Sequence, residues 1–407
     1  MTTTPHPNTV RFVLLTIVID AMGFGIIMPV GPRLLMEVGH LDLAGAAYTS
    51  TFLTLLFAGT QFLFGTIIGN LGDRFGRRPV LLGALGGFAI NFLLQAQAHS
   101  LVWLFAGQAL SGIFGGTYAP AQAALADVTP PQDRARVFGY VGAAFGIGFV
   151  IGPVIGGLLG GFGPRVPFYA ASALAALNFV YGLTVFPETL ARENRRAFDW
   201  RRANPLGALL KIRELPGLTM LSCVLFLWQI ASLVYPLTWS YYLIGAYGAS
   251  SQLIGLSLAI VGVAMAAVQI LLTGKLVARF GERTIALLGL SMATWTFIIL
   301  AISPLNPWLM LLGFVMPLGN LAQPALMAMI SRRATATNQG EVQGFSSSVM
   351  SMGSIIAPLV LNPTLAYFMS PRAPFRAPGA AFAMAAMIAL LTILVLSLTP
   401  RARPAPS

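Results

Sequence analysis

The segment "GNLGDRFGRRP", residues 69–79, recurs 205 positions later (274 − 69) as "GKLVARFGERT", residues 274–284. Six letters are identical in the two copies. The same offset relates Gly148 to Gly353 and Pro153 to Pro358. The repetition predicts that the chain is built from two structurally similar halves.

Both copies of the segment lie between long apolar runs. Hydrophobic residues make up 57% of the 407 residues and charged residues only 9%, whereas a soluble domain carries about 25% charged residues. A surface this apolar must face lipid, and a helix needs roughly 20 apolar residues to cross a bilayer. The composition therefore predicts an all-α membrane protein with twelve transmembrane helices.

The apolar runs place these helices along the chain as two groups of six. The predicted spans cover residues 10–32, 46–68, 79–98, 101–126, 136–160 and 166–186, then 217–243, 251–273, 284–303, 307–330, 342–368 and 379–399. The predicted domains are an amino-terminal six-helix bundle (1–186), a polar linker (187–216) and a carboxyl-terminal six-helix bundle (217–407), related by pseudo-symmetry. Two such halves are the plan of a transporter that rocks around a central substrate site.

The net charge of +12 comes from basic residues on one side of the predicted membrane map. All but four of the 24 Lys and Arg residues fall in the two termini, the linker and the alternate loops on the same side. The exceptions are Arg33, Arg165, Arg372 and Arg376. This is the positive-inside pattern, so it argues against nucleic-acid binding and places both termini and the linker in the cytoplasm.

Asp20 is the one acidic residue predicted deep inside a span. It lies about ten residues into the first helix, hence roughly 15 Å along it, and no Arg, Lys or His is predicted at that depth. An ionised carboxylate in the bilayer core is costly, and holding a proton removes that cost. Asp20 is therefore the candidate proton-coupling residue; the alternative is a hydrogen bond to a neighbouring helix with no role in transport.

Charged residues crowd the predicted cytoplasmic end of the second, third and fourth spans. The cluster consists of Asp73, Arg74, Arg77, Arg78 and Asp127. We expect it to act as a gate on that side; the alternative is that the arginines only anchor the topology.

The fifth predicted span carries glycines at four-residue spacing. In "GYVGAAFGIGFVIGPVIGG", Gly148, Gly152 and Gly156 share one helix face, and Pro153 lies beside them. Small residues at this spacing allow a second helix to approach closely. We expect a tight helix contact along this face.

Several polar and aromatic side chains lie inside predicted spans and are candidates for substrate binding. An apolar cavity with a few placed polar groups suits an amphipathic ligand, although many such residues bond helix to helix instead. The candidates are Asn91, Gln108, Trp228, Gln229, Gln269, Trp295 and Asn320. We expect no metal and no cofactor, because phosphate-loop and zinc-protease motifs are absent and the three histidines lie outside the spans.

These motifs resemble those of the major facilitator superfamily, in particular its twelve-helix drug–proton antiporters. The 69–79 segment is similar to that superfamily's motif A. The fifth span is similar to the antiporter motif C, which marks exporters. The matching positions are Gly139, Gly148, Gly152, Pro153, Gly156 and Gly157. Stretches such as "LADVTPPQDRARVFG" are closer still to the tetracycline-efflux branch, and the resemblance covers nearly the whole chain.

The chain departs from that branch at four positions inside the spans. Asn91 and Ala293 stand where the branch has acidic residues, Gln108 where it has an arginine and Met265 where it has a histidine. These departures argue against cationic metal–tetracycline chelates as substrates. They also argue against proton coupling through more than one acid.

The resemblance implies proton-driven export of a small amphipathic compound across the bacterial inner membrane, by a protein that acts as a monomer. Its expected partners are the substrate, protons and the lipid bilayer, and it is not expected to be an enzyme. Two alternatives remain: a proton-coupled carrier of a metabolite, and a membrane sensor that transports nothing. The antiporter motif favours the exporter over the metabolite carrier. The sequence repeat and the buried Asp20 favour a transporter over the sensor.

The charge distribution predicts the membrane topology. Reporter fusions at the carboxyl end and within residues 187–216 should both report a cytoplasmic location, because 13 of the basic residues between Arg11 and Arg213 lie on that side (six before the linker and seven within it). An external reading at either position would contradict the twelve-helix map.

Overall fold

The computed structural model describes residues 7–115, 118–130, 133–198, 219–306, 316–333 and 339–400. Within these ranges the chain is helical and contains no β-strand. Its internal contacts divide it into two compact units. Unit 1 comprises Met1–Pro205 and Ser240–Val263, and unit 2 comprises Leu206–Trp239 and Ala264–Ser407.

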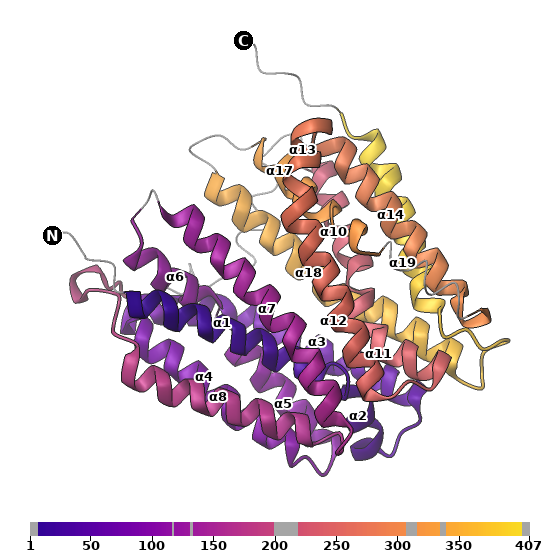
Figure 1. The fold of residues 1–407 in the computed structure, drawn as a ribbon, viewed down its shortest axis with the longest axis horizontal. Helices are drawn as coiled ribbons and strands as arrows, with labels where there is room; N and C mark the ends of the chain where they lie inside the picture. The colour runs from indigo at the N-terminus through magenta and orange to yellow at the C-terminus, as the bar shows by residue number, and fades with distance from the viewer. Residues whose placement is uncertain are drawn as a thin grey trace. The chain divides into compact units, whose positions relative to one another are not determined.

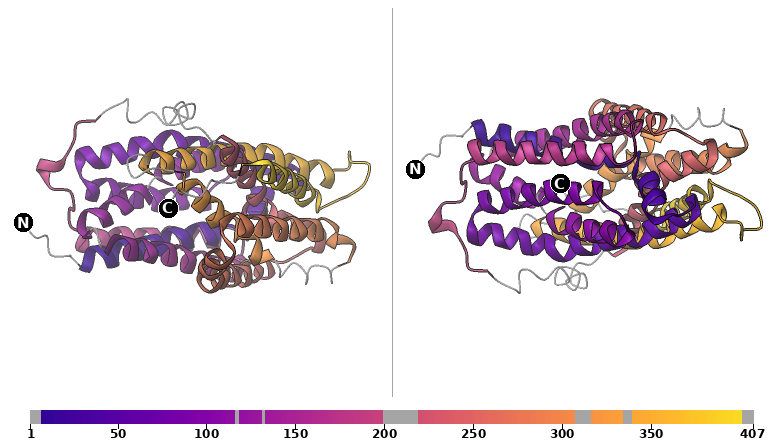
Figure 2. Two further views of the ribbon diagram at one scale, coloured as in Figure 1. Left: turned by 90° about the horizontal axis from the view of Figure 1, so that it is seen from above. Right: turned by 90° about the horizontal axis from the view of Figure 1, so that it is seen from below.

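The first part of the chain forms eight helices of unit 1, and the long ones among them run side by side (Figures 1 and 2). They are α1 (Pro7–Ile27), α2 (Gly31–Gly39), α3 (Leu43–Phe75), α4 (Arg77–Ala96), α5 (Leu101–Phe114), α6 (Tyr118–Val128), α7 (Arg134–Gly160) and α8 (Val166–Val185). A 3₁₀ turn, η3 (Arg192–Asn194), follows. Of the predicted linker, residues 187–198 are described and residues 199–216 lie outside the described ranges.

The second part of the chain supplies the remaining helices. They are α10 (Thr219–Ser232), α11 (Val234–Tyr247), α12 (Ser251–Val268), the π-helical turn η5 (Gln269–Thr273), α13 (Gly274–Phe280), α14 (Glu282–Ile302), the 3₁₀ turn η6 (Ser303–Leu305), α16 (Met316–Gly319), α17 (Ala322–Ser331), α18 (Gln339–Met369) and α19 (Ala380–Leu398). The outer part of α11 and most of α12 belong to unit 1.

Ten segments in the described ranges are long and apolar enough to cross a membrane. The prediction of an all-α membrane protein is therefore confirmed, while the total of twelve spans stays a prediction. The predicted span 101–126 appears as two shorter helices, α5 and α6. The predicted span 307–330 is described only from residue 316, as α16 and α17.

The sequence repeat is also a structural repeat. Gly76 separates α3 from α4 with φ of 107°, and Gly281 separates α13 from α14 with φ of 78°. Only glycine adopts positive φ at no steric cost. Both copies of the segment therefore turn the chain sharply at equivalent residues.

The repeat also places equivalent arginines at equivalent helix ends. Arg78 donates from Nη2 to the carbonyl of Leu183 in the last turn of α8. Arg283 donates to the carbonyls of Leu396 and Thr399 at the end of α19. The last carbonyls of a helix have no partner within the helix, and a cation there also opposes the helix dipole. Each arginine therefore fixes the last helix of its own half.

The first predicted span ends earlier than expected. The prediction ran to residue 32, but α1 ends at Ile27 and a separate helix, α2, begins at Gly31. Pro32 at the start of α2 has no N–H to donate, so the helical bond pattern cannot continue through this position. The helix is therefore broken between Ile27 and Gly31.

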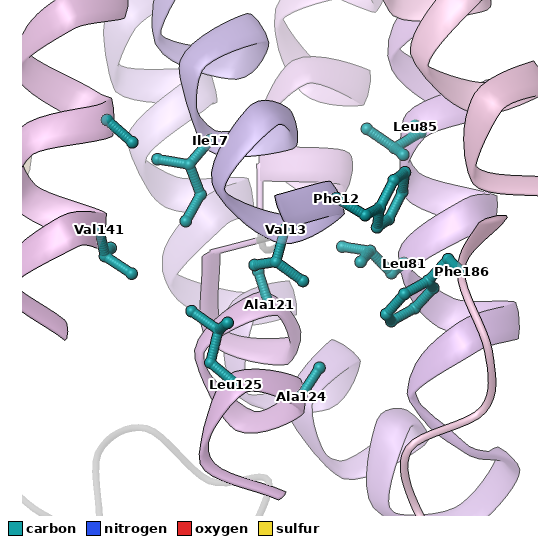
Figure 3. Packing of buried hydrophobic residues seen from close by; sticks show 11 residues of the cluster. Phe12, Val13, Ile17, Leu81, Leu85, Ala121, Ala124, Leu125, Val141 and Phe186 are labelled. Atoms are coloured by element: carbon teal, nitrogen blue, oxygen red, sulfur yellow. The ribbon is translucent and has the colours of Figure 1, made fainter. Parts of the chain in front are cut away.

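The core of unit 1 is formed where α1 packs among α4, α6 and α7. Phe12 and Val13 of α1 are fully buried, and the Phe12 ring stacks on Phe186 with centroids 4.8 Å apart. Figure 3 shows these side chains with Leu81 from α4 and Val141 from α7 closing the cluster. This packing fixes the amino-terminal half of α1.

Unit 2 has its own core of aromatic rings. Tyr235 of α11 lies 5.5 Å from Phe297 of α14 and 5.7 Å from Phe382 of α19, between ring centroids. Trp239 meets Phe382 edge to face at 6.1 Å. Offset and edge-to-face contacts are the favoured geometries for aromatic rings, so three helices are joined at this point.

Candidate functional site

Arg77 is the centre of the charged cluster at the predicted cytoplasmic end of unit 1. Its Nη1 lies 2.6 Å from Asp73 Oδ1, and its Nε lies 3.4 Å from Asp127 Oδ2. The Arg77 side chain is only 11% exposed. A nearly buried guanidinium requires such partners, because removing them would leave a charge out of water. Arg77 therefore ties α3 and α4 to α6.

The first residues after α8 join this cluster, which sequence reasoning missed. Glu188 Oε1 accepts from the backbone N–H of Arg77 at 2.8 Å and from that of Leu190 at 3.0 Å. Its Oε2 lies 3.6 Å from Arg195 Nη2. A carboxylate is favoured at the amino end of a helix, where backbone N–H groups are unpaired. Glu188 thus caps α4 and holds the start of the linker against it.

Two further contacts bind the linker to the same place. The N–H of Arg196 donates to the carbonyl of Asp73 at 3.0 Å, and Thr189 Oγ1 donates to Asp127 Oδ2 at 3.4 Å. A Cβ at Gly76 would overlap the carboxylate of Glu188. Glycine is therefore needed here both for its positive φ and for the close approach of the linker. The signal in the sequence is an acid directly after a predicted span, at the start of the polar linker.

The protonation of Asp127 is set by competing effects. Burial raises the pKa of the Asp127 carboxyl above its ordinary value, while the Arg77 guanidinium and the hydrogen bond from Thr189 oppose the rise. A raised pKa means that the carboxyl gains a proton at a higher pH than an ordinary aspartate. Acidification therefore weakens the Asp127 link to Arg77 before it affects ordinary surface carboxylates.

The other two arginines of the predicted cluster lie apart from Arg77. Arg74 stacks over the exposed ring of Phe75, with its Cζ 4.9 Å from the ring centroid, and Arg78 is bonded to the end of α8. A cavity of about 210 Å³ lies beside Asp73 and Arg196. It is smaller than the ~300–1,000 Å³ typical of ligand pockets, so it does not mark the substrate site.

The glycine face of α7 packs against α1. A Cβ at Gly148 would overlap the carbonyl of Val18, and one at Gly152 would lie 2.7 Å from the carbonyl oxygen of Met22. A Cβ at Gly156 would overlap the carbonyl of Ile26. The two backbones touch over three turns, which is the close approach that the four-residue spacing allows.

The next glycine of the motif faces another helix. A Cβ at Gly157 would lie 2.8 Å from the carbonyl oxygen of Ser251 and 3.0 Å from Gly255 Cα, both on α12. Pro153 lies between the two contacts, with its Cδ 2.7 Å from a Cβ built at Gly25. The motif therefore has two faces, one on α1 and one on α12.

Asp20 lies on the part of α1 that contacts these glycines. It is half-buried. One turn earlier, Thr16 and Asn178 of α8 form a buried pair, with Asn178 Nδ2 donating to Thr16 Oγ1 at 3.2 Å. The α1 segment around Asp20 thus packs against α7 on one side and bonds to α8 on another.

The two candidate substrate-binding residues of unit 1 differ in their burial. Asn91 of α4 is 0% exposed and donates from Nδ2 to Ser111 Oγ of α5 at 2.6 Å. Gln95 Nε2 donates to the same hydroxyl at 3.4 Å. Asn91 therefore joins α4 to α5, whereas Gln108 of α5 is half-buried and remains accessible at its surface.

The candidates of unit 2 are spread over several helices. Gln229 of α10 donates from Nε2 to Ser354 Oγ of α18 at 3.2 Å, and the neighbouring Trp228 is buried with an Nε1 that has no hydrogen-bond partner. Gln269 is exposed at the first residue of the π-helical turn. Trp295 is 62% exposed on α14.

The last candidate, Asn320, is half-buried at the turn between α16 and α17. In the ranges that the structure describes, no group of three or more His, Cys, Asp or Glu residues could hold a metal ion. The site chemistry found there consists of charged clusters at helix ends, the Asp20 carboxyl inside the first span, and uncharged polar groups within the spans.

Ten apolar helical segments within the described residues are long enough to span a membrane. Together with the repeated turn in the two units and the charged residues at helix ends, they are typical of a membrane transport protein. A profile of the Major Facilitator Superfamily matches residues 13–246 and 220–407. The chain belongs to this superfamily, and membership assigns it to transporters and not to enzymes.

Individual relatives cover most of the chain. It is 36% identical to the tetracycline resistance protein, class C, of Escherichia coli over 87% of this chain and 89% of that protein. It is 30% identical to multidrug resistance protein 2 of Bacillus subtilis (strain 168) over 86% of this chain and 87% of that protein.

Solved structures show the same fold at low identity. The nucleoside transporter NupG superposes with a TM-score of 0.77 at 13% identity, covering 97% of this chain and 100% of that chain. The D-xylose–proton symporter superposes with a TM-score of 0.74 at 16% identity, covering 96% of this chain and 97% of that chain. At these identities the likeness supports the fold alone.

The contact between α7 and α1 predicts the effect of a side chain at Gly152. Gly152→Leu should lower transport about fivefold to a hundredfold, because overpacking costs about 1–3 kcal/mol and each 1.4 kcal/mol is about tenfold. Gly146→Leu is the matched control, since a Cβ at Gly146 meets no atom within 4 Å. Transport is compared at equal membrane abundance, and equal loss in both variants would contradict a specific contact.

The cap that Glu188 forms on α4 predicts a change in the linker. Glu188→Ala should make trypsin cut within residues 187–198 about fivefold faster, because loss of a partly exposed, charge-assisted bond is worth on the order of 1 kcal/mol. Glu193→Ala is the control, since Glu193 is exposed in the same segment. Unchanged cleavage in Glu188→Ala would mean that the carboxylate does not hold the linker.

Proposed function

We propose that this protein exports a small amphipathic compound in exchange for protons. The relatives support this, because a tetracycline resistance protein and a multidrug resistance protein share about a third of its residues. A membrane transporter protects a cell from a drug by moving the drug out. Residues 1–186 and 217–407 are proposed to be the two halves that move in this cycle.

The observation that carries the proposal is the contact between the antiporter motif and the helix that bears Asp20. Gly148 meets Val18 and Ala21, which flank Asp20 in sequence. In the described spans, Asp20 is the only acidic residue more than one turn from a span end. A change of charge at Asp20 therefore arises on a helix that is closely packed against α7.

Such a contact links protonation to conformation. Backbones that touch over three turns move together or separate as a unit, because close-packed interfaces do not deform gradually. Protonation of Asp20 removes a charge from a low-dielectric region, which favours a more buried position of α1. Release of the proton restores the charge and favours a position of α1 in which Asp20 is more exposed to water. The exchange of proton and substrate then follows from alternating access.

The charged cluster is proposed to act as the cytoplasmic gate. Asp73, Arg77 and Asp127 bind three helices at one level, and Arg74 and Arg78 extend the positive charge around them. Opening this side requires that some of these bonds break. The raised pKa of Asp127 means that acid on this side weakens its bond to Arg77 at a higher pH than would be needed for an ordinary aspartate.

The substrate is proposed to meet uncharged polar groups set in apolar walls. Gln108 and Gln229 suit this role because both are half-buried on spanning helices. Asn91 is proposed to shape the wall and not to touch the ligand, because its side chain is enclosed and bonded to Ser111. Apart from Asp20, the described spans carry no acidic residue more than one turn from a span end, which favours a neutral or weakly basic amphipathic compound over a metal chelate.

The location and the membrane orientation of the protein belong to the same proposal. We place it in the bacterial cytoplasmic (inner) membrane with both termini and the linker in the cytoplasm, and as a monomer, since one chain supplies both halves. The positive-inside distribution supports this orientation.

Asp20→Asn tests the proposal. The amide resembles the protonated acid and cannot release a proton, so the variant should bind substrate but lose proton-driven transport. The measurement is substrate-induced proton movement in everted membrane vesicles with a panel of amphipathic compounds, with and without a pH gradient.

Glu193→Gln is the control, because it makes the same change of charge at an exposed linker residue. It should retain coupling. Coupling equal to wild type in Asp20→Asn would show that the proton takes another route, and facilitated diffusion would then describe the protein better.

A further inference from the structure

Residues 240–263 pack with unit 1, although the sequence repeat assigns them to the second half of the chain. They comprise the outer part of α11 and most of α12. Their contacts lie at the end of unit 1 that carries the α1–α2 break and the loop between α7 and α8. By the charge distribution this is the external side.

Two side chains hold this segment to the α1–α2 break. Ser240 Oγ donates to the carbonyl of Met28 at 2.7 Å, and Arg33 Nη2 donates to the carbonyl of Ala249 at 3.1 Å. Ser240 and Ala249 are both buried. The two bonds run in opposite directions across the same contact, since each segment supplies one donor and one acceptor.

Both acceptors are carbonyls that a helix end leaves without a donor. Met28 follows the end of α1, and the residue four positions on is Pro32, which has no N–H. Ala249 follows the end of α11 at Tyr247. Orphan carbonyls need an outside partner, and a cation is favoured at the carboxyl end of a helix. Ser240 and Arg33 supply these partners.

The helices next to these bonds touch closely. Gly157 of α7 and Gly255 of α12 face each other, so that a Cβ on either would lie about 3 Å from the Cα of the other. A Cβ at Gly160 would lie 2.9 Å from Ser251 Cβ, and Ser251 is 0% exposed. No space for solvent remains between α7 and α12 at this level.

Arg33 is also unusual for its position. It is one of only four basic residues on the predicted external side, where Lys and Arg are normally depleted. Another of the four, Arg165, pairs with Glu37 at the far end of α2, with Nε 2.9 Å from Oε1. The short helix α2 is therefore fixed at both ends by an arginine.

We propose that Arg33 and Ser240 are positioning residues that form an external latch, which holds residues 240–263 against the α1–α2 break and must release before the external side can open. The proposal rests on the proposed function and orientation only for the direction of opening. Loss of the latch should shift the population of states toward one in which α12 separates from α7.

The test uses the single cysteine of the chain, Cys223, which allows a cysteine-free background by Cys223→Ser. In that background Ser251→Cys places a thiol in the closed contact between α7 and α12. Labelling of intact cells with a membrane-impermeant maleimide then reports how often this contact opens to the outside.

Arg33→Met should raise the labelling rate about tenfold, the ratio that corresponds to one hydrogen bond from a charged donor. Ser240→Ala should raise it severalfold and independently, which keeps the test valid if Arg33→Met fails to reach the membrane. Arg372→Met is the matched control, because Arg372 is exposed on the same predicted side. It should leave the rate unchanged.

His99→Cys, at an exposed residue between α4 and α5, reports the orientation separately. If that thiol is labelled only in everted vesicles, the proposed orientation is wrong, and the latch comparison is made from that side. Equal labelling rates for the thiol at position 251 in Arg33→Met, Ser240→Ala and the parent would overturn the latch. That result would not contradict the proposal of proton-coupled export.

Discussion

Water is absent from the bilayer core, so every backbone N–H and C=O of a spanning segment must find its partner inside the protein. Helices meet this requirement along their length, and the difficulty is confined to their ends and breaks. Several long-range side-chain bonds of this protein lie at such places for that reason. Ser240 and Arg33 serve carbonyls at the ends of α1 and α11, and Arg78 and Arg283 serve those of α8 and α19.

A second consequence of the lipid environment is that helices gain little by hiding apolar side chains from one another. Association depends on close packing, which small residues permit. The glycines of α7 show this on two faces, since Gly152 lies on α1 and Gly157 lies on α12. A helix in contact on both sides transmits movement between its neighbours. This places α7 between the segment that bears Asp20 and the external contact.

Much of the fold could be predicted because the sequence features that indicate it lie within short stretches of the chain. Span positions follow from apolar runs, and the turn at Gly76 and Gly281 follows from a repeated segment. The candidate sites were harder. Asp20 stood out because a carboxylate is conspicuous among apolar residues, whereas Glu188 did not, because acids are ordinary in a polar linker. Its role as a cap on α4 depends on where the chain returns after α8.

The sequence by itself determined that the chain spans a membrane, that it repeats, and which end of each span is basic, because these properties depend only on what each segment does in lipid or water. Tertiary structure alone decided which faces meet. Membrane helices are apolar all round, so periodicity does not identify the inward face as it does in soluble helices. The bond between Asn91 and Ser111 and the exposure of Trp295 on α14 could therefore be known only from the packed helices.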